Sequence, residues 1–212
     1  MKPEEFLTKL NKLPEESRGS FSTIVLSLSK IAAAEAIRSM LKDNNFAVRV
    51  NAIKAIRKHQ LKIYEKELMQ SLLEDSFEIK IAAIKTIASF GDFKHYKLLK
   101  AFYDENQQAK SVILDSFSNY SDNEEVYYFI LSQITSKDEK VIQIVKEWFK
   151  KAFEHDVLLP WIINAYISVP FEAKRVFEKT FLEYLPKLFY DNRVSYRLKL
   201  NYLLKKRNDG LA

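Results

Sequence analysis

The sequence predicts an all-α fold, an α-solenoid of stacked antiparallel helix pairs, and three observations lead to that prediction. First, the chain has 212 residues but 3 glycines, where an average usage of roughly 7% would give about 15. β-Sandwiches, β-barrels and glycine-rich phosphate loops need more glycine than this for their turns. Second, apolar residues make up 47% of the chain and recur with the spacing of one helix face. Third, the sequence repeats itself with a period of about 31 residues, which is typical of stacked helix pairs.

The repeat is clearest where residues 46–56 align with residues 77–87, because eight of the eleven aligned positions hold residues of the same kind. A weaker copy follows at residues 109–117, and a fourth at residues 140–148 keeps only the helical spacing of its apolar residues. These segments are the expected second helices of the pairs. Alanines in their centres predict that neighbouring second helices approach closely. The expected core residues are Val48, Ala52, Ile53, Ile56, Ile79, Ala83, Ile84 and Ile87.

The first helix of each pair is expected just before an acidic or polar turn. These turns lie at Asp43, Asp75, Asp104 and residues 135–138. The corresponding first helices are expected at residues 33–42, 63–74, 95–103 and 126–134. Short polar connections such as His59-Gln60 and Gly91-Asp92 separate one pair from the next. The whole chain is therefore expected to form about ten to thirteen helices of ordinary length.

The chain is expected to form a single repeat domain over residues 1–212. Clear repeats occupy residues 33–120 and divergent repeats residues 121–186. Residues 190–207 are basic and amphipathic, and we expect them to cap the stack, with their last cations complementing the helix dipole. Two opening segments lie outside the clear repeats, at residues 4–13 and 21–29.

The spacing of a turn aspartate and a following Val-Arg pair resembles the HEAT repeat. Asp43, Val48 and Arg49 show that spacing, with the pair five and six residues after the aspartate. The resemblance implies an armadillo-like α-solenoid in which Arg49, and likewise Lys80 and Lys110, bonds to its own turn or the neighbouring one. It implies little about function, because HEAT arrays serve as scaffolds, transport factors, nucleic-acid readers and occasional enzymes.

Charge and apolar patterning indicate which partners and which cellular compartment suit the protein. The net charge is +6, from 34 Lys and Arg against 28 Asp and Glu, which suits an acidic partner without requiring one. The most apolar stretch, residues 157–171, is interrupted by two prolines and is shorter than the roughly 20 residues of a membrane span. The absence of cysteine excludes disulfides and Cys-based zinc sites. We therefore expect a cytoplasmic protein whose membrane contact, if any, is indirect.

The second helices of HEAT units line a concave face, so the resemblance places the candidate binding residues on that face. Lys54 and Lys85 begin a basic ladder that Asp115 and Glu147 end. A nucleic-acid track needs several phosphate contacts in line, so this short ladder suits an acidic protein segment as well as a phosphate backbone. Ordinary solvated lysines are the third alternative. The candidate partner-binding residues are Asn51, Lys54, Arg57, Lys58 and Lys85.

The residues that carry catalytic chemistry are sparse and scattered. The three histidines, His59, His95 and His155, lie one or two repeats apart, and no metal-binding His/Glu motif is present. There is no nucleophile elbow and no thiol. The sequence therefore predicts no metal, no cofactor, no small-molecule substrate and no enzymatic activity.

Aromatic residues become dense from Tyr120 onward, and we expect most of them in the core and some in an exposed apolar patch. Because some HEAT-like proteins are DNA glycosylases, that activity is a remote third hypothesis. Its candidate residue types are Trp148, Trp161, Asp115 and Arg175. Trp148 lies on the apolar face of its helix, which favours core packing over base binding.

These observations favour a non-catalytic scaffold or adaptor that binds another protein, whose contact segment is expected to be acidic. The alternative is binding of a nucleic-acid phosphate backbone to the same basic residues.

Overall fold

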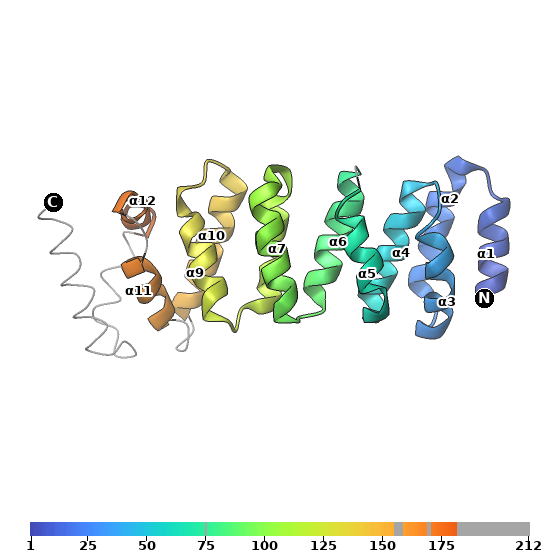
Figure 1. The fold of residues 1–212 in the computed structure, drawn as a ribbon, viewed down its shortest axis with the longest axis horizontal. Helices are drawn as coiled ribbons and strands as arrows, with labels where there is room; N and C mark the ends of the chain where they lie inside the picture. The colour runs from blue at the N-terminus through green and yellow to red at the C-terminus, as the bar shows by residue number, and fades with distance from the viewer. Residues whose placement is uncertain (75, 155–158, 169–170, 182–212) are drawn as a thin grey trace, which may run out of the picture. The chain divides into compact units, whose positions relative to one another are not determined.

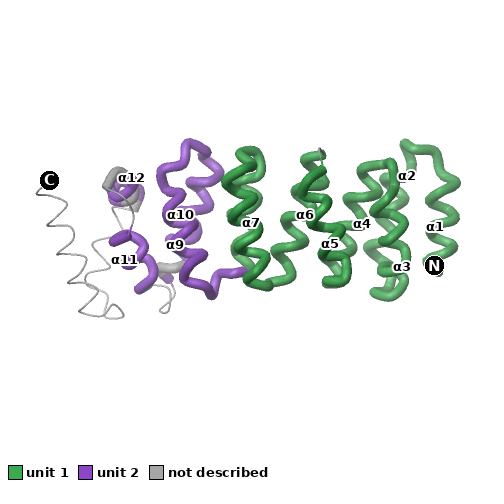
Figure 2. Tube along the Cα trace, in the orientation of Figure 1, with its two compact units in different colours: residues 1–119 green, residues 120–212 purple. Residues whose placement is uncertain are grey.

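All regular structure in the described part of the chain is helical, as the sequence predicts. The computed structural model describes residues 1–74, 76–154, 159–168 and 171–181, and these contain twelve α-helices and no strand. The expected number of helices is thus confirmed for these residues. The chain divides into two compact units, residues 1–119 and 120–212, each described separately below (Figure 2).

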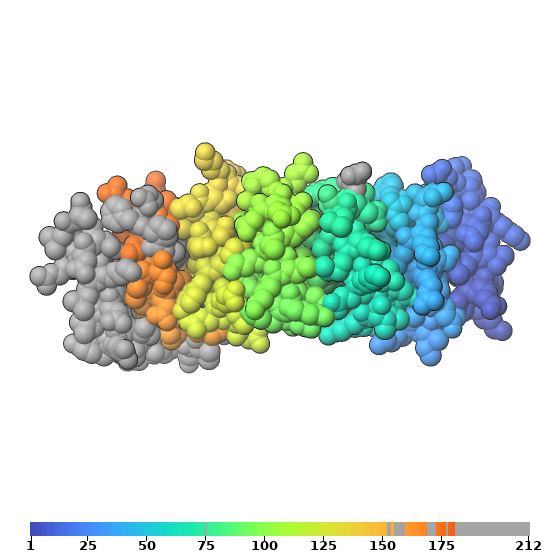
Figure 3. All heavy atoms as spheres, in the orientation of Figure 1, coloured from blue at the N-terminus to red at the C-terminus, as the bar shows by residue number. Residues whose placement is uncertain are grey.

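Unit 1 consists of helix pairs that follow one another in chain order (Figures 1 and 3). Its first helices are α1 (Pro3–Lys12), α3 (Lys30–Met40), α5 (Glu65–Ser71) and α7 (Phe93–Glu105). Its second helices are α2 (Glu15–Ser22), α4 (Phe46–His59), α6 (Phe77–Ser89) and α8 (Lys110–Ser116). Short 3-10 turns extend several of them, at η1 (Thr23–Ser27), η2 (Lys62–Tyr64) and η3 (Gln107–Ala109), and η4 (Phe117–Tyr120) follows α8. The first opening segment, residues 4–13, corresponds to α1, whereas the second, residues 21–29, falls mainly on η1, and α2 begins earlier, at Glu15.

The boundaries of the helices follow from local residue chemistry. Asn45 caps α4 by accepting a hydrogen bond from the Ala47 amide at 2.9 Å, and Asp92 caps α7 in the same way. The second helices end in the polar connections that the sequence marks. Gln60 adopts a left-handed conformation with φ 52° at the end of α4, and Gly91 has φ 69° after α6.

The core of unit 1 lies where the second helices pack on one another. α2 packs against α4, α4 against α6, and α6 against α8, while α1 packs against α3. Ala52 and Ala83 are fully buried, and so are the other six predicted core residues of these two helices. Small side chains let two helices approach closely, and the adjoining isoleucines then join the apolar stripes of successive pairs into one core.

Unit 2 contains α9 (Glu124–Ser132), η5 (Gln133–Thr135), α10 (Glu139–Glu154), α11 (Leu159–Ser168) and α12 (Phe171–Phe181). Its core is aromatic: the Tyr127 ring meets Trp148 edge-on at 4.7 Å between centroids and lies 5.4 Å from Trp161. Trp148 is 7% exposed, which confirms the expectation that it serves packing. The predicted capping helix at residues 190–207 lies outside the described residues.

Among the described residues, every helix is too short or too polar to traverse a lipid bilayer.

The close contact between second helices predicts the effect of enlarging an alanine. We expect Ala83→Leu to lower the free energy of unfolding by about 1–3 kcal/mol, because the added atoms have no room between α6 and its neighbours. Urea denaturation followed by circular dichroism measures this. Ala101→Leu, at an exposed position on α7, is the matched control and should change stability by less than about 0.5 kcal/mol. Equal effects of the two variants would contradict the close packing.

Burial of Tyr127 predicts a loss of stability in alkali. Its side chain is fully buried, and burial raises its pKa from 10.0 to about 12. The folded state therefore holds the proton more tightly, so this contribution to stability is complete below pH 10 and is lost as the pH rises towards 12. Between pH 9 and pH 12, Tyr127→Phe should lose about 2 kcal/mol less stability than the wild type in denaturant titrations. Parallel pH profiles for the two proteins would contradict this.

Candidate interaction surface

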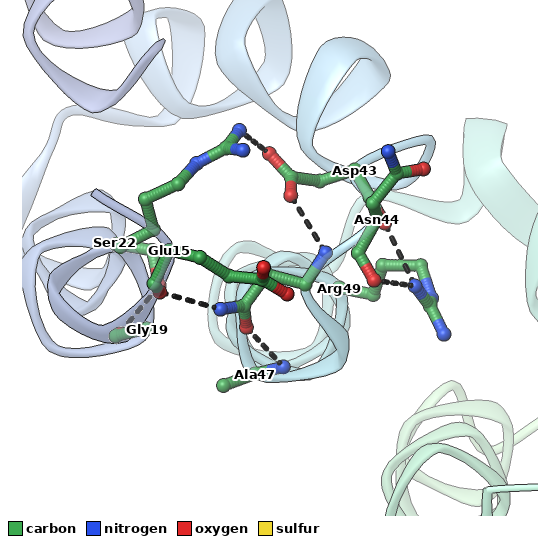
Figure 4. Close-up of polar contacts among 9 residues, drawn as sticks. Glu15, Gly19, Ser22, Asp43, Asn44, Ala47 and Arg49 are labelled. Atoms are coloured by element: carbon green, nitrogen blue, oxygen red, sulfur yellow. Dashed lines mark hydrogen bonds and ion pairs between the residues drawn. The ribbon is translucent and has the colours of Figure 1, made fainter. Parts of the chain in front are cut away.

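Arg49 is a structural residue of the turn between α3 and α4, as the repeat resemblance implies. Its guanidinium donates to the backbone carbonyls of Asp43 at 2.7 Å and Asn44 at 3.0 Å (Figure 4). The same group pairs with the Glu74 carboxylate of the next turn at 3.2 Å. Arg49 therefore links two successive turns and is not free to bind a partner.

Asp43 ties the same turn to the preceding helix pair. One carboxylate oxygen accepts the amide of Asn45 at 2.9 Å, and the other pairs with Arg18 on α2 (Figure 4). The backbones are close here, because a Cβ added at Gly19 would lie 2.9 Å from the Cβ of Ala47. The glycine thus allows α2 to lie directly against α4.

Asn51 does not project from the surface, contrary to the sequence-based expectation. Its side chain is 6% exposed, and its amide donates to the Gly19 carbonyl at 3.1 Å and to the Ser22 hydroxyl at 2.8 Å. The reason is α2, which packs on α4 and covers this face. Asn51 therefore holds α2 in place and is not a binding residue.

The candidate cations occupy the exposed face of the second helices. Lys54 on α4 and Lys85 on α6 are exposed, and Arg57 is half-buried. These three side chains form no ion pair with any described residue. Lys58 is also exposed, but its ammonium donates to the Leu26 carbonyl of η1. Lys54, Arg57 and Lys85 are therefore the cations of this set whose side chains have no polar partner among the described residues.

Apolar side chains accompany these cations. Val50 lies four residues before Lys54, and Ile81 four residues before Lys85, so each pair shares a helix face. Both apolar side chains are half-buried. Asp115 is exposed on α8, the next second helix. The surface of α4 and α6 thus presents two basic–apolar pairs followed by an acidic residue.

Two exposed isoleucines were not predicted from the sequence. Ile31 is 75% exposed and Ile63 is 73% exposed. Each directly follows a lysine near the start of a first helix. The signal that could have revealed them is the recurrence of Lys-Ile at an interval of 32 residues.

A shallow apolar groove of about 390 Å³ lies between α5 and α7. Met69 and Leu98 are among its lining residues, and Leu73, which follows α5, is 81% exposed beside it. No titratable cluster accompanies this groove beyond Lys66 and Glu105.

The histidines do not assemble a reaction centre in the described residues. His95 is 3% exposed, with Nε2 3.2 Å from a Glu65 carboxylate oxygen. That carboxylate also binds Lys94 at 2.8 Å, and the lysine lowers its pKa. Burial lowers the pKa of His59. Within the described ranges, no group of three or more His, Asp or Glu side chains is placed to hold a metal ion.

The residue types considered for a glycosylase are divided between the two units. Asp115 belongs to unit 1, whereas Trp148, Trp161 and Arg175 belong to unit 2. Trp148 is buried and unable to stack on an extruded base. The four residues therefore do not come from one unit, and Trp148 serves packing.

Comparison with models of protein families and with curated proteins finds no match to this chain. The resemblance to HEAT repeats therefore rests on the residues and contacts described above.

The turn network predicts which aspartate stabilises the fold. We expect Asp43→Ala to lower the free energy of unfolding by about 2–4 kcal/mol, because Arg18 and the Asn45 amide lose their partner in a largely buried setting. Asp104→Ala removes the corresponding aspartate of a later pair, which is exposed, and should change stability by less than about 0.5 kcal/mol. Thermal or urea unfolding of the two variants measures the difference. Similar losses in both would refute the assignment.

Proposed function

We propose that the chain is a HEAT-like α-solenoid and works as a non-catalytic scaffold that binds an acidic segment of another protein. The observation that carries this proposal is the placement of Lys54 and Lys85, exposed and unpaired, at equivalent positions of neighbouring second helices. Arg57 adds a third cation beside them.

The repeat contacts support the solenoid part of the proposal. Second helix packs on second helix through buried alanines, and Arg49 joins successive turns. Such nearest-neighbour contacts are the pattern by which repeat proteins build an extended binding face.

The apolar neighbours of the cations favour a polypeptide over a nucleic acid. Val50 and Ile81 flank Lys54 and Lys85, and a partner segment with alternating acidic and apolar side chains would contact both kinds of residue. A phosphate backbone gains nothing from the apolar residues. Asp115 on the next second helix would also repel a backbone that continued along the face.

A charge-reversal variant tests the proposal. Lys54→Glu combined with Lys85→Glu should weaken binding of a fluorescein-labelled acidic peptide containing Asp, Glu and Leu by at least tenfold, measured by anisotropy at about 100 mM salt. The matched control, Lys66→Glu with Lys97→Glu, reverses two exposed lysines on first helices and should bind within about twofold of wild type.

Two results would overturn the proposal. One is equal peptide affinity in both double variants, because the patch would then not be the binding surface. The other is tighter binding of duplex DNA than of the peptide with a log–log salt slope steeper than about −3, which indicates several phosphate contacts. That second result would establish the nucleic-acid alternative instead.

A further inference from the structure

Lysines recur at intervals of 32 residues at the starts of the first helices of unit 1. Lys30 is the first residue of α3, Lys62 is the first residue of η2, which leads into α5, and Lys94 is the second residue of α7. All three are exposed. The starts of these helices lie along one edge of the unit, the lower edge in Figure 1. We call Lys30, Ile31, Lys62 and Ile63 the basic–apolar edge.

The two isoleucines of this edge have no packing role. Ile31 is 75% exposed and Ile63 is 73% exposed, although each begins a helix whose other apolar residues are largely buried. Leu28 packs inward at the entry to α3 and supplies the apolar contact there. A single exposed aliphatic residue is common in proteins. Two at the same repeat position, each beside an exposed lysine, form a pattern.

The lysines of the edge are also placed against the helix dipole. The N-terminus of a helix carries partial positive charge, so a lysine there is slightly unfavourable. Arg57 and Lys58 lie in the last turn of α4, where the dipole favours them. Lys30 and Lys62 gain no such stabilisation from the dipole, and neither forms an ion pair with a described residue, although the Lys62 ammonium lies over the Phe90 ring, 5.9 Å from its centroid. Neither the helix dipole nor an ion pair therefore explains the positions of these two lysines.

The surroundings of the edge contain more cations than acids. The pKa of His59 is lowered by burial and further by the charges of Lys58 and Lys30, which shows that these cations are near one another. Two acids near the edge, Glu65 and Asp92, pair with Lys94, at 2.8 and 3.8 Å, whereas Glu35, four residues after Ile31 on α3, is exposed. The Lys94 amide, and to a smaller extent the charge of Lys62, lower the pKa of Asp92, so Lys62 also interacts with this acid.

Exposed acids lie at the opposite ends of the helix pairs, together with exposed Lys12 and Lys42. Glu15 and Glu16 begin α2 at the turn from α1, and Asp104 and Glu105 end α7. All four are exposed. The two Lys-Ile pairs therefore lie at the ends of the helix pairs that are opposite to these four acids.

The geometry points to a membrane contact: we propose that the basic–apolar edge docks unit 1 on the surface of an anionic phospholipid bilayer. Ile31 and Ile63 enter the boundary between headgroups and acyl chains, and Lys30 and Lys62 lie among the lipid phosphates. A nucleic acid would satisfy the lysines but leave the isoleucines in water. Flexible, strongly hydrated lysines suit mobile headgroups, which impose no fixed bonding geometry. This inference does not rest on the proposed function, because Lys54 and Lys85 take no part in it.

Vesicle co-sedimentation of the full chain tests the inference. The wild type should bind vesicles of phosphatidylcholine with about 30% phosphatidylserine, and should not bind pure phosphatidylcholine, because anionic lipid supplies the attraction for each lysine. Ile31→Ser with Ile63→Ser should reduce the partition coefficient at least about tenfold, since it removes the apolar contact and leaves the charge. Lys30→Glu with Lys62→Glu should reduce it at least about 25-fold.

Two controls separate this surface from other features of unit 1. Leu73→Ser removes an aliphatic residue of equal exposure at the other end of α5 and should bind vesicles as the wild type does. Lys54→Glu with Lys85→Glu should also keep vesicle binding within about threefold, whatever its effect on peptide binding. Absence of wild-type binding to the anionic vesicles overturns the inference. So does undiminished binding by the Ile31→Ser, Ile63→Ser variant, because the contact would then be electrostatic only.

Discussion

The structure of unit 1 depends on the close approach of its second helices. One helix pair cannot bury its apolar stripe alone, so each pair is stable only when its neighbour covers that stripe. Ala52 and Ala83 make this approach possible, and both are fully buried. Gly19 allows the same close approach between α2 and α4, because a Cβ at this position would lie 2.9 Å from the Cβ of Ala47. Larger side chains at these positions would separate the pairs and expose the isoleucines between them.

The polar residues at the turns hold the pairs in register once they are packed. Asp43 joins its turn to Arg18 of the pair before it, and Arg49 joins the turn to Glu74 of the pair after it. Between α2 and α4, the Asn51 amide donates a hydrogen bond to the Ser22 hydroxyl. These contacts use charged residues near the turns, whereas Lys54, farther along a second helix, is exposed and forms no ion pair with a described residue.

Helical periodicity was sufficient to predict much of the fold, and burial by neighbours explains where it failed. The expected second helices at residues 46–56 and 77–87 lie within α4 and α6, and their core residues are those predicted. Asn51 was misplaced because polarity suggests exposure, and a single helix gives no sign that α2 covers it. The expected first helix at residues 63–74 is divided between η2 and the shorter α5. Ile31 and Ile63 were missed because an apolar residue at helical spacing normally indicates a core position.

The charged residues that begin α2, α3 and η2 contribute an electric moment parallel to the helices of unit 1, which Glu4 and Glu5 at the start of α1 partly offset. Exposed lysines begin α3 and η2, whereas exposed glutamates begin α2. A tumbling molecule with such a moment is turned by any strong external field before it touches the source of that field. Its orientation on arrival is then set at a distance of about 10 Å, the range over which ions at 0.1 M leave charges unscreened. Dilute salt would lengthen that range, so the speed of association, more than its final strength, would respond to ionic conditions.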